Sequence, residues 1–197
     1  MVTQPDPPAR QPQQPRVALR AAAGDDALLL RRWRAEESVR RHQPLQEVPI
    51  SQLRAELEGQ EVRDLYRGRG ERFVWIVEEE GDPCGWVTLV VGNWEHGLAE
   101  IGYALSSAFQ GRGVMATAMG LLLPDLFLHT TLERIEARCA VGNVASQRVL
   151  EKLGFVREGL LRGYFALHGR RVDHHLYSLL RCDFLPGTAE PRGLAVP

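Results

Sequence analysis

The sequence has few cysteines, a single lysine and no long apolar run. Its three cysteines, Cys84, Cys139 and Cys182, lie far apart and show no CxxC or Cys/His spacing of the kind that binds zinc. Their odd number argues against a disulfide framework, which favours a reducing, cytoplasmic compartment. The lack of an apolar N-terminal stretch and of a membrane-length run argues against a signal peptide and a transmembrane helix.

A strong charge of either sign is also missing, because the net charge is only −1. No whole-molecule field therefore recruits nucleic acid or an anionic membrane, and neither is expected as a partner. An apolar fraction of 44% and a charged fraction of 25% are typical of one globular domain with a full core. Residues 1–15 and 186–197, both rich in proline, are expected to be disordered tails around a domain at 16–185.

The folded part alternates between helical and strand periodicity. Its middle runs strand–helix–strand–helix–strand, which predicts an α/β or α+β fold with a mixed central sheet. Pro124 lies inside one expected helix, so a kink or an early end near residues 120–123 is predicted. The expected helices are 27–41, 52–67, 109–127 and 143–154, and the expected strands are 16–22, 72–79, 84–94, 97–106, 132–140, 155–167 and 171–182.

Two glycines stand where the pattern of the third helix begins, in the stretch "FQGRGVMATAM". Glycine costs a helix roughly 0.5–1 kcal/mol relative to alanine, so Gly111 and Gly113 indicate a need for bare backbone. A helix N-terminus has unpaired N–H groups, and phosphate oxygens could approach them closely here. Gln110, Arg112 and Val114 would add further N–H groups. A plain glycine turn that leads into a core helix is the open alternative.

Two common phosphate-binding motifs do not fit this stretch. The sequence lacks GxxxxGK[ST], which argues against a P-loop nucleotide hydrolase. GxGxxG fails as well, because Ala116 replaces the third glycine and no acidic residue follows in clear register at a later strand end. The glycines alone therefore leave the ligand undefined.

The same stretch resembles motif A of the GNAT superfamily, the acetyl-coenzyme A (acetyl-CoA) dependent N-acetyltransferases. That motif reads Q/R-x-x-G-x-G/A, and residues 110–115 match it except for methionine at the last position, as in the RimJ/RimL-like branch. Further on, "NVASQRVLEKLGFVREG" resembles the family block N-x-x-S-x-x-x-x-E-K-L-G-F-x-x-E-G. "HGRRVDHHLYSLL" is similar to the ending of the same branch, G-x-x-x-D-x-x-x-Y-x-L. The resemblance covers about residues 16–184.

This resemblance implies the GNAT fold, a mixed central sheet that is flanked by helices and contains one splayed strand pair. It implies that strands 97–106 and 132–140 diverge, that the coenzyme A diphosphate lies on the glycine loop, and that the pantetheine arm lies in the gap. Met115 would then point its side chain away from the diphosphate, and no metal is expected. The residues implied to contact acetyl-CoA are Tyr103, Ala104, Leu105, Gln110, Gly111, Arg112, Gly113, Val114, Met115, Ala116, Asn143 and Ser146.

Three side chains are candidates for proton transfer. Glu100 matches the general base of the histone acetyltransferase branch, with a paired or solvated carboxylate as the alternative. Ser146 matches a serine proposed in RimL-like enzymes to protonate the leaving thiolate, although a hydroxyl is a poor acid and positioning is its other role. Tyr164 has a phenol whose pKa is nearer that of a thiol, unless it packs in the core. Phe165 replaces a glutamate that RimL-like enzymes use, which disfavours their water-relayed base or shifts the base to Glu100.

Other reactive residues favour structural roles. Asp173, His174 and His175 suggest a metal site or triad, but adjacent strand residues point to opposite faces, so the two histidines cannot easily share a ligand. Cys139 could be a nucleophile, yet the sequence places no histidine beside it, which favours a buried apolar cysteine. Asn143 has a second interpretation as the N-cap of the helix that follows.

These features predict transfer of an acetyl group to a primary amine, preferably a protein N-terminal α-amine, by direct attack in a ternary complex. An α-amine with a pKa of about 7.7–8.0 is partly neutral at pH 7, whereas a lysine near 10.4 needs more help. The alternatives are an acetyltransferase for a polyamine, aminoglycoside or amino acid, and an inactive acyl-CoA-binding sensor. The resemblance also allows a homodimer. Acidic residues in the second helical region suit a cationic acceptor or form a solvated face: Glu47, Glu56, Glu58, Glu61 and Asp64.

Overall fold

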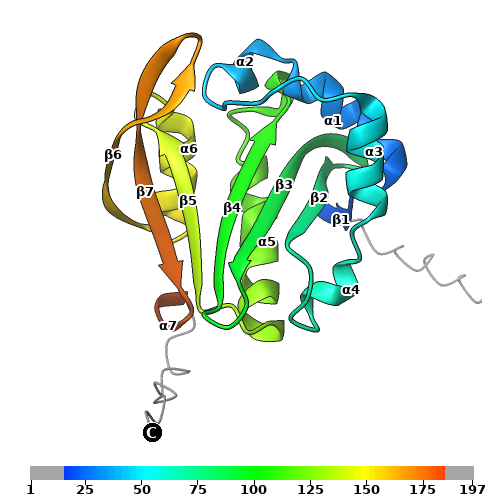
Figure 1. Ribbon diagram of the computed structural model, residues 1–197, viewed down its shortest axis with the longest axis vertical. Helices are drawn as coiled ribbons and strands as arrows, with labels where there is room; N and C mark the ends of the chain where they lie inside the picture. Colours follow the sequence, from blue (N-terminus) through cyan, green and yellow to red (C-terminus); the bar gives the residue numbers. More distant parts are fainter. Residues whose placement is uncertain (1–15, 185–197) are drawn as a thin grey trace, which may run out of the picture.

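The protein, a computed structural model that describes residues 16–184, is built on one seven-stranded mixed sheet with helices on both faces (Figure 1). The strand order is β1-β2-β3-β4-β5-β7-β6, and only the β4–β5 pair is parallel. The predicted mixed α/β sheet is confirmed, whereas the predicted tails lie outside the described residues. The strands are β1 (Val17–Ala21), β2 (Arg72–Glu79), β3 (Asp82–Asn93), β4 (Leu98–Leu105), β5 (Arg134–Ala140), β6 (Val156–Leu167) and β7 (Arg170–Leu180).

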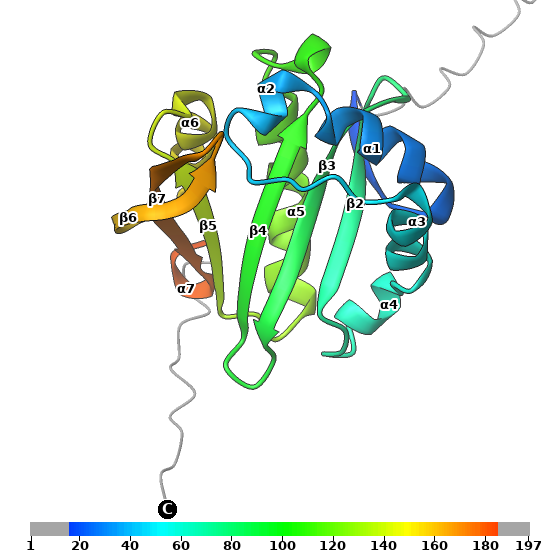
Figure 2. The same cartoon turned by 45° about the horizontal axis from the view of Figure 1, so that its top comes forward.

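The helices divide into two layers (Figures 1 and 2). Helices α5 and α6 cover one face of the sheet and α1 to α3 lie on the other, while α4 contributes its buried Leu65 to the core under α5. The bounds are η1 (Gly24–Asp26), α1 (Ala27–Arg34), α2 (Glu37–Arg40), α3 (Ile50–Glu58), α4 (Val62–Leu65), η2 (Ser107–Phe109), α5 (Val114–His129), α6 (Val144–Lys152) and α7 (Arg181–Phe184).

Each layer encloses its own hydrophobic core. The core under α5 and α6 contains Phe127, Ile135 and Tyr177, and the core under α1 and α3 contains the stacked rings of Trp33 and Trp86, 6.3 Å apart. Strand side chains alternate between the two cores because successive residues point to opposite faces. In β4, Ile101, Tyr103 and Leu105 face α5, whereas Ala104 faces the α1 side. Tyr103 and Ala104 of β4 therefore lie on opposite faces of the sheet.

Two helices that the sequence predicts as continuous are each divided. The predicted helix 27–41 breaks before α2 because Glu36 is extended and its carboxylate binds Ser106 Oγ at 2.7 Å and the Ser107 N–H at 2.8 Å. The predicted helix 52–67 breaks because the Gln60 side chain bonds both backbone groups of Val74, at 2.8 and 3.1 Å. In both places a contact with a distant strand or loop overrides local helical periodicity.

Helix α5 continues through Pro124 to His129, so the predicted early end near 120–123 is wrong. Strands β6 and β7 are joined by a tight turn in which His168 and Gly169 have φ of 49° and 75°. No helix among residues 16–184 is both long enough and apolar enough to cross a membrane. All three cysteines lie in this described range and are free thiols.

Candidate active site

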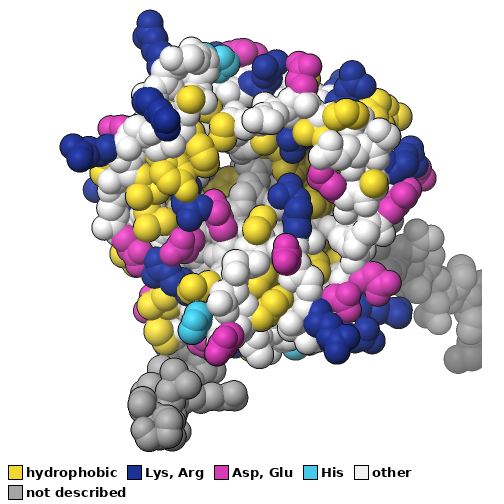
Figure 3. Space-filling view, viewed as in Figure 1, with side chains coloured by type: hydrophobic (Ala, Val, Ile, Leu, Met, Phe, Trp, Pro, Cys, Tyr) yellow, Lys and Arg dark blue, Asp and Glu magenta, His cyan; other side chains and the backbone are white. Residues whose placement is uncertain are grey.

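The sheet opens at its single parallel pair. Strand β4 pairs with β5 only from Leu98 to Glu100, and its remaining residues, 101–105, have no partner on β5. Strand β5 meanwhile stays paired with β7 as far as Ala140 opposite His174. The two strands therefore diverge and leave a gap between them, visible in Figure 2. Figure 3 shows the surface hollowed here, with hydrophobic atoms along the margin formed by β5 to β7.

The glycine loop, residues 110–113, lies beyond the open end of β4. Gly111 and Gly113 have φ of 76° and 79°, and a Cβ at either would meet no atom within 4 Å, so the backbone there is bare. Within the described part of the chain, none of the N–H groups from Gly111 to Ala116 has a protein acceptor; the first bond of this helix end is from Thr117 to the Gly113 carbonyl, at 3.0 Å. A row of free donors on bare backbone fits phosphate oxygens.

The side chains of the loop point away from this row of donors. Arg112 binds Glu79 at 2.7 Å, and the Glu79 carboxylate is buried and also 3.4 Å from Arg16. Met115 is 4% exposed and belongs to the α5 core, as the sequence required. Gln110 donates from Nε2 to the Leu105 carbonyl at 2.9 Å. The loop thus presents its backbone rather than its side chains.

On the α6 side of the gap, the Tyr103 hydroxyl lies 2.9 Å from Ser146 Oγ. Asn143 caps α6 by accepting the Ser146 N–H at 3.2 Å, which confirms its predicted N-cap role. Burial raises the pKa of Tyr103, so its phenol stays protonated at neutral pH. The family resemblance implies only a coenzyme contact for Tyr103 and no role for its hydroxyl. One large polar residue between the small Gly102 and Ala104 is the sequence signal for that role.

Cys139 lies next to this group but favours a structural role. The side chain is 3% exposed, and its Sγ is 3.5 Å from the carbonyl oxygens of Ala140 and Asn143. Burial raises the pKa of the Cys139 thiol, which disfavours a reactive thiolate. The sequence places no histidine beside Cys139, whereas the fold pairs His175 of β7 directly opposite it. Among residues 16–184, however, neither histidine nitrogen bonds this thiol.

Glu100 and Tyr164 gather on the opposite face of the sheet. The Glu100 carboxylate is hydrogen-bonded to the Arg138 guanidinium, which lies 5.4 Å from the centre of the Tyr164 ring. Tyr164 packs against Phe165 at 4.4 Å and His174 at 5.7 Å between ring centres. The three predicted proton-transfer residues therefore form two groups, and the hydroxyl that lies beside Ser146 belongs to Tyr103 rather than Tyr164.

An ion-pair network continues from Arg138 along this face. Arg134 binds Glu136 at 2.9 Å and Glu158 at 2.5 Å, and Glu158 also accepts a hydrogen bond from Ser178 at 2.7 Å. Arg134, then Ser178, lowers the pKa of Glu158 from 4.5 to about 2. The network ties β5, β6 and β7 together below the gap.

We expect replacement of Glu158 by glutamine to flatten the acid dependence of stability. A carboxylate whose pKa is lower in the folded protein than in the unfolded chain stabilises the fold fully above about pH 4.5. That stabilisation is lost as the pH falls through about 2. The effect is modest because the side chain is 37% exposed. Thermal unfolding midpoints measured in this pH window should fall more for the wild type than for Glu158→Gln. Two parallel curves would contradict this account.

The segment between α1 and α3 covers the gap on the side away from α6. Glu36 holds it to the loop after β4, and Gln43 donates from Nε2 to the Tyr103 carbonyl at 2.7 Å. An acceptor that approaches the gap from this face meets residues 36–49. No local pattern marks Gln43, because its partner is a backbone atom in a distant strand.

A splayed parallel pair with a free helix N-terminus at its open end defines a class of protein that holds an extended, phosphate-bearing ligand between two strands. The family model described as "Acetyltransferase (GNAT) domain" matches residues 16–156. The chain therefore belongs to the GNAT family and is an N-acetyltransferase.

Related proteins that match this chain over different lengths support the assignment. An uncharacterized N-acetyltransferase, p20, of Bacillus licheniformis is 32% identical over 171 residues, 86% of this chain and 95% of p20. The [ribosomal protein uS5]-alanine N-acetyltransferase of Escherichia coli is 31% identical over 87 residues, 44% of this chain and 45% of the enzyme. A spermidine N(1)-acetyltransferase of Vibrio cholerae is 28% identical over 129 residues, 64% of this chain and 75% of the enzyme.

Solved structures agree with the fold. RimJ of Mycobacterium smegmatis, in complex with CoA-disulfide, has a TM-score of 0.71 at 27% identity and covers 83% of this chain and 81% of its own. RimL, a ribosomal L7/L12 alpha-N-protein acetyltransferase in complex with coenzyme A, has a TM-score of 0.73 at 21% identity, with coverages of 86% and 96%.

Proposed function

We propose that this N-acetyltransferase uses acetyl-CoA to acetylate the α-amine of a protein N-terminus by direct attack in a ternary complex. One observation carries the proposal: the N–H groups of Gly111 to Ala116, at the open end of a splayed strand pair, have no acceptor among residues 16–184. Such a row binds a diphosphate, and the adjacent gap accepts an extended arm that pairs with backbone as an added strand would.

Acetyl-CoA would supply the acetyl group as a thioester. The glycine loop binds the diphosphate, and the backbone of 103–105 orients the pantetheine arm within the gap. Ser146 Oγ, held by the Tyr103 hydroxyl at 2.9 Å, donates a proton to the departing sulfur or positions it. The Tyr103 phenol stays protonated because of its burial and so remains a hydrogen-bond donor. Much of the acceleration then comes from orientation of the two reactants.

The acceptor class that we propose depends on which group removes the proton of the acceptor amine. Glu100, the predicted general base, is engaged by Arg138. An α-amine with a pKa of about 7.7–8.0 needs only a weak base or water to lose its proton. One relative is named as acting on a ribosomal protein and another as acting on spermidine, and both of these substrates offer a primary amine.

An acceptor screen tests the proposal. Release of coenzyme A thiol is measured with short peptides of free N-terminus, the same peptides with blocked N-terminus, spermidine, an aminoglycoside and free amino acids. We expect turnover with free peptides alone, and a kcat/KM that rises with pH through the pKa of the peptide amine. Turnover of spermidine with none of any peptide would replace the proposal with a small-amine enzyme. Tight acetyl-CoA binding without any turnover would indicate a sensor.

A further inference from the structure

A cavity of about 430 Å³ lies between α1 and the segment that leads to α3, outside the gap. Its volume suits a small ligand or one end of a peptide. Three of its lining residues are arginines, Arg31, Arg34 and Arg40, against the single carboxylate of Glu47. The other lining residues are Ala35, Leu45, Gln46, Val48, Pro49 and Leu53.

The arginines of this cavity are poorly neutralised. Among residues 16–184, no carboxylate lies within 4.0 Å of Arg31 or Arg34, and Arg40 has only the exposed Glu47, at 3.8 Å. Arg34 is half-buried and donates to the Gln46 carbonyl at 3.2 Å. Burial, followed by the charge of Arg72, lowers the pKa of Arg34, although a guanidinium stays charged at neutral pH. An anion in the cavity would relieve this excess of positive charge.

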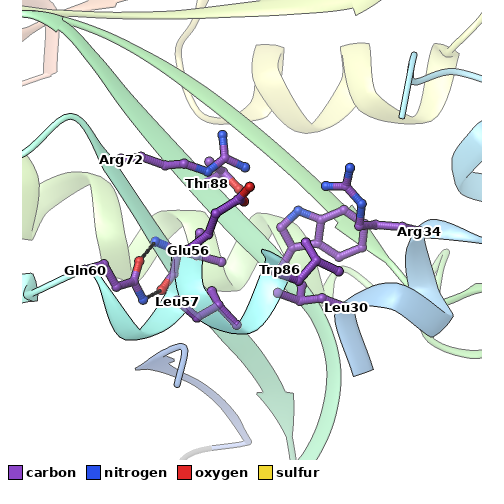
Figure 4. A pocket seen from close by; sticks show the side chains of 10 residues that line it. Leu30, Arg34, Glu56, Leu57, Gln60, Arg72, Trp86 and Thr88 are labelled. Carbon is purple, nitrogen blue, oxygen red and sulfur yellow. Dashed lines mark hydrogen bonds between the residues drawn. The ribbon is translucent and has the colours of Figure 1, made fainter. Parts of the chain in front are cut away.

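A second cavity beside it is too small for a ligand. It measures about 20 Å³ and lies under α3, between Arg34, Arg72 and Trp86 (Figure 4). Such a space holds about one water molecule. Glu56 lines this inner cavity together with Arg34 and Arg72, and its charge opposes the lowering of the Arg34 pKa. Among residues 16–184, the excess positive charge of the outer cavity is therefore carried mainly by Arg31 and Arg40.

The outer cavity is close to the place where acetyl transfer would occur. Gln43, bonded to the Tyr103 carbonyl at the gap, is two residues before Leu45 in its lining, a Cα separation of at most about 7 Å. Leu45 and Val48 also pack on the same hydrophobic core as Ala104 of β4. A peptide whose amine lies in the gap would pass Gln43 on its way to the cavity, and three to five extended residues, which span about 10–18 Å, are the length that we assign to this path.

We propose that the cavity lined by Arg31, Arg34 and Arg40 binds a carboxylate of the acceptor, so that the enzyme selects N-termini with an acidic residue about three to five positions in. This inference rests on the proposed function. Of the five acidic residues that the sequence offered for a cationic acceptor, Glu47 lines this cavity beside Arg40, whereas Glu58 is 3.9 Å from Arg54 and Asp64 is 3.6 Å from Arg67. A polycation would instead meet like charges in this cavity.

Three matched peptides test the selection. They begin with the same three residues and continue with two glutamates, two glutamines or two lysines. We expect kcat/KM for the glutamate peptide to exceed that for the lysine peptide by about tenfold, chiefly through KM, and the ratio to fall with added salt. In Arg31→Gln/Arg40→Gln the ratio should fall to about threefold or less, because two positive charges of the cavity are removed. Both side chains are exposed, so we expect the variant to fold as the wild type does. Arg34→Lys should lower the ratio as well, because lysine keeps the charge but not the planar fork.

The control is Arg32→Gln, which removes one positive charge from an exposed position of α1 outside the cavity and should keep the wild-type ratio. Equal kcat/KM for the three peptides would overturn the inference and leave the proposed function standing. A preference that survives in Arg31→Gln/Arg40→Gln would overturn it too. Turnover of small amines with none of any peptide would refute both proposals together.

Discussion

Replacing Gly111 and Gly113 together by alanine is expected to raise the Kd for acetyl-CoA by about tenfold to a hundredfold. Alanine in the left-handed region costs about 1–2 kcal/mol per residue, so the loop would abandon φ of 76° and 79° and rotate its N–H groups. Hydrogen bonds to a charged group contribute about 1.5–3 kcal/mol each, and each 1.4 kcal/mol is tenfold in affinity. Titration calorimetry with acetyl-CoA measures the change directly.

The matched control is Gly68→Ala/Gly81→Ala. These glycines have φ of 68° and 89°, and a Cβ at either would meet no atom within 4 Å, as at the loop glycines, but they lie in the turn after α4 and in the turn between β2 and β3. The two double variants should lose similar stability, while only the loop variant loses affinity. If both bind acetyl-CoA as the wild type does, the free N–H groups do not hold the diphosphate. If both lose affinity equally, the effect comes from stability alone.

The second large effect is expected on turnover rather than on binding. Ser146→Ala should lower kcat by about a hundredfold, within the usual range for loss of a proton-transfer group, with the Kd for acetyl-CoA changed little. Tyr103→Phe should lower kcat by a smaller factor, because it removes the partner that holds Ser146 Oγ at 2.9 Å while it keeps the ring in the core. Pre-steady-state and steady-state thiol release separate this change from effects on binding.

Tyr66→Phe is a suitable control for loss of a tyrosine hydroxyl. Its hydroxyl donates to Asp125 at 2.5 Å and so joins the end of α4 to α5, whereas the Tyr103 hydroxyl joins β4 to α6. Tyr164→Phe tests whether Tyr164, rather than Ser146, donates the proton to the leaving sulfur. A loss of kcat in Tyr164→Phe but not in Tyr103→Phe would move the proton donor to the face that holds Arg138. The proposed arrangement would then be wrong about which side of the gap carries the chemistry.

Local sequence was informative wherever local physics decides the structure. The strand period of 72–79 gives β2 with the same bounds, because branched and aromatic side chains alternate between two buried faces. Asn143 was recognisable as a cap because a short polar side chain at a helix start satisfies a free N–H. The divided helices were not recognisable. Glu36 and Gln60 leave helical geometry to bond groups that are 70 and 14 residues away in the chain.

The sequence by itself determined the sheet class, the glycine loop and the family, since each depends on periodicity, on the backbone freedom of glycine or on residues a few positions apart. Only the tertiary structure decided which side chains share a face or a cavity. It placed Tyr103 beside Ser146, His175 opposite Cys139, and Arg112 on the buried Glu79. It also gathered Arg31, Arg34 and Arg40 around one cavity. The physical reason is that such neighbours are set by strand register and helix packing, which depend on the whole chain at once.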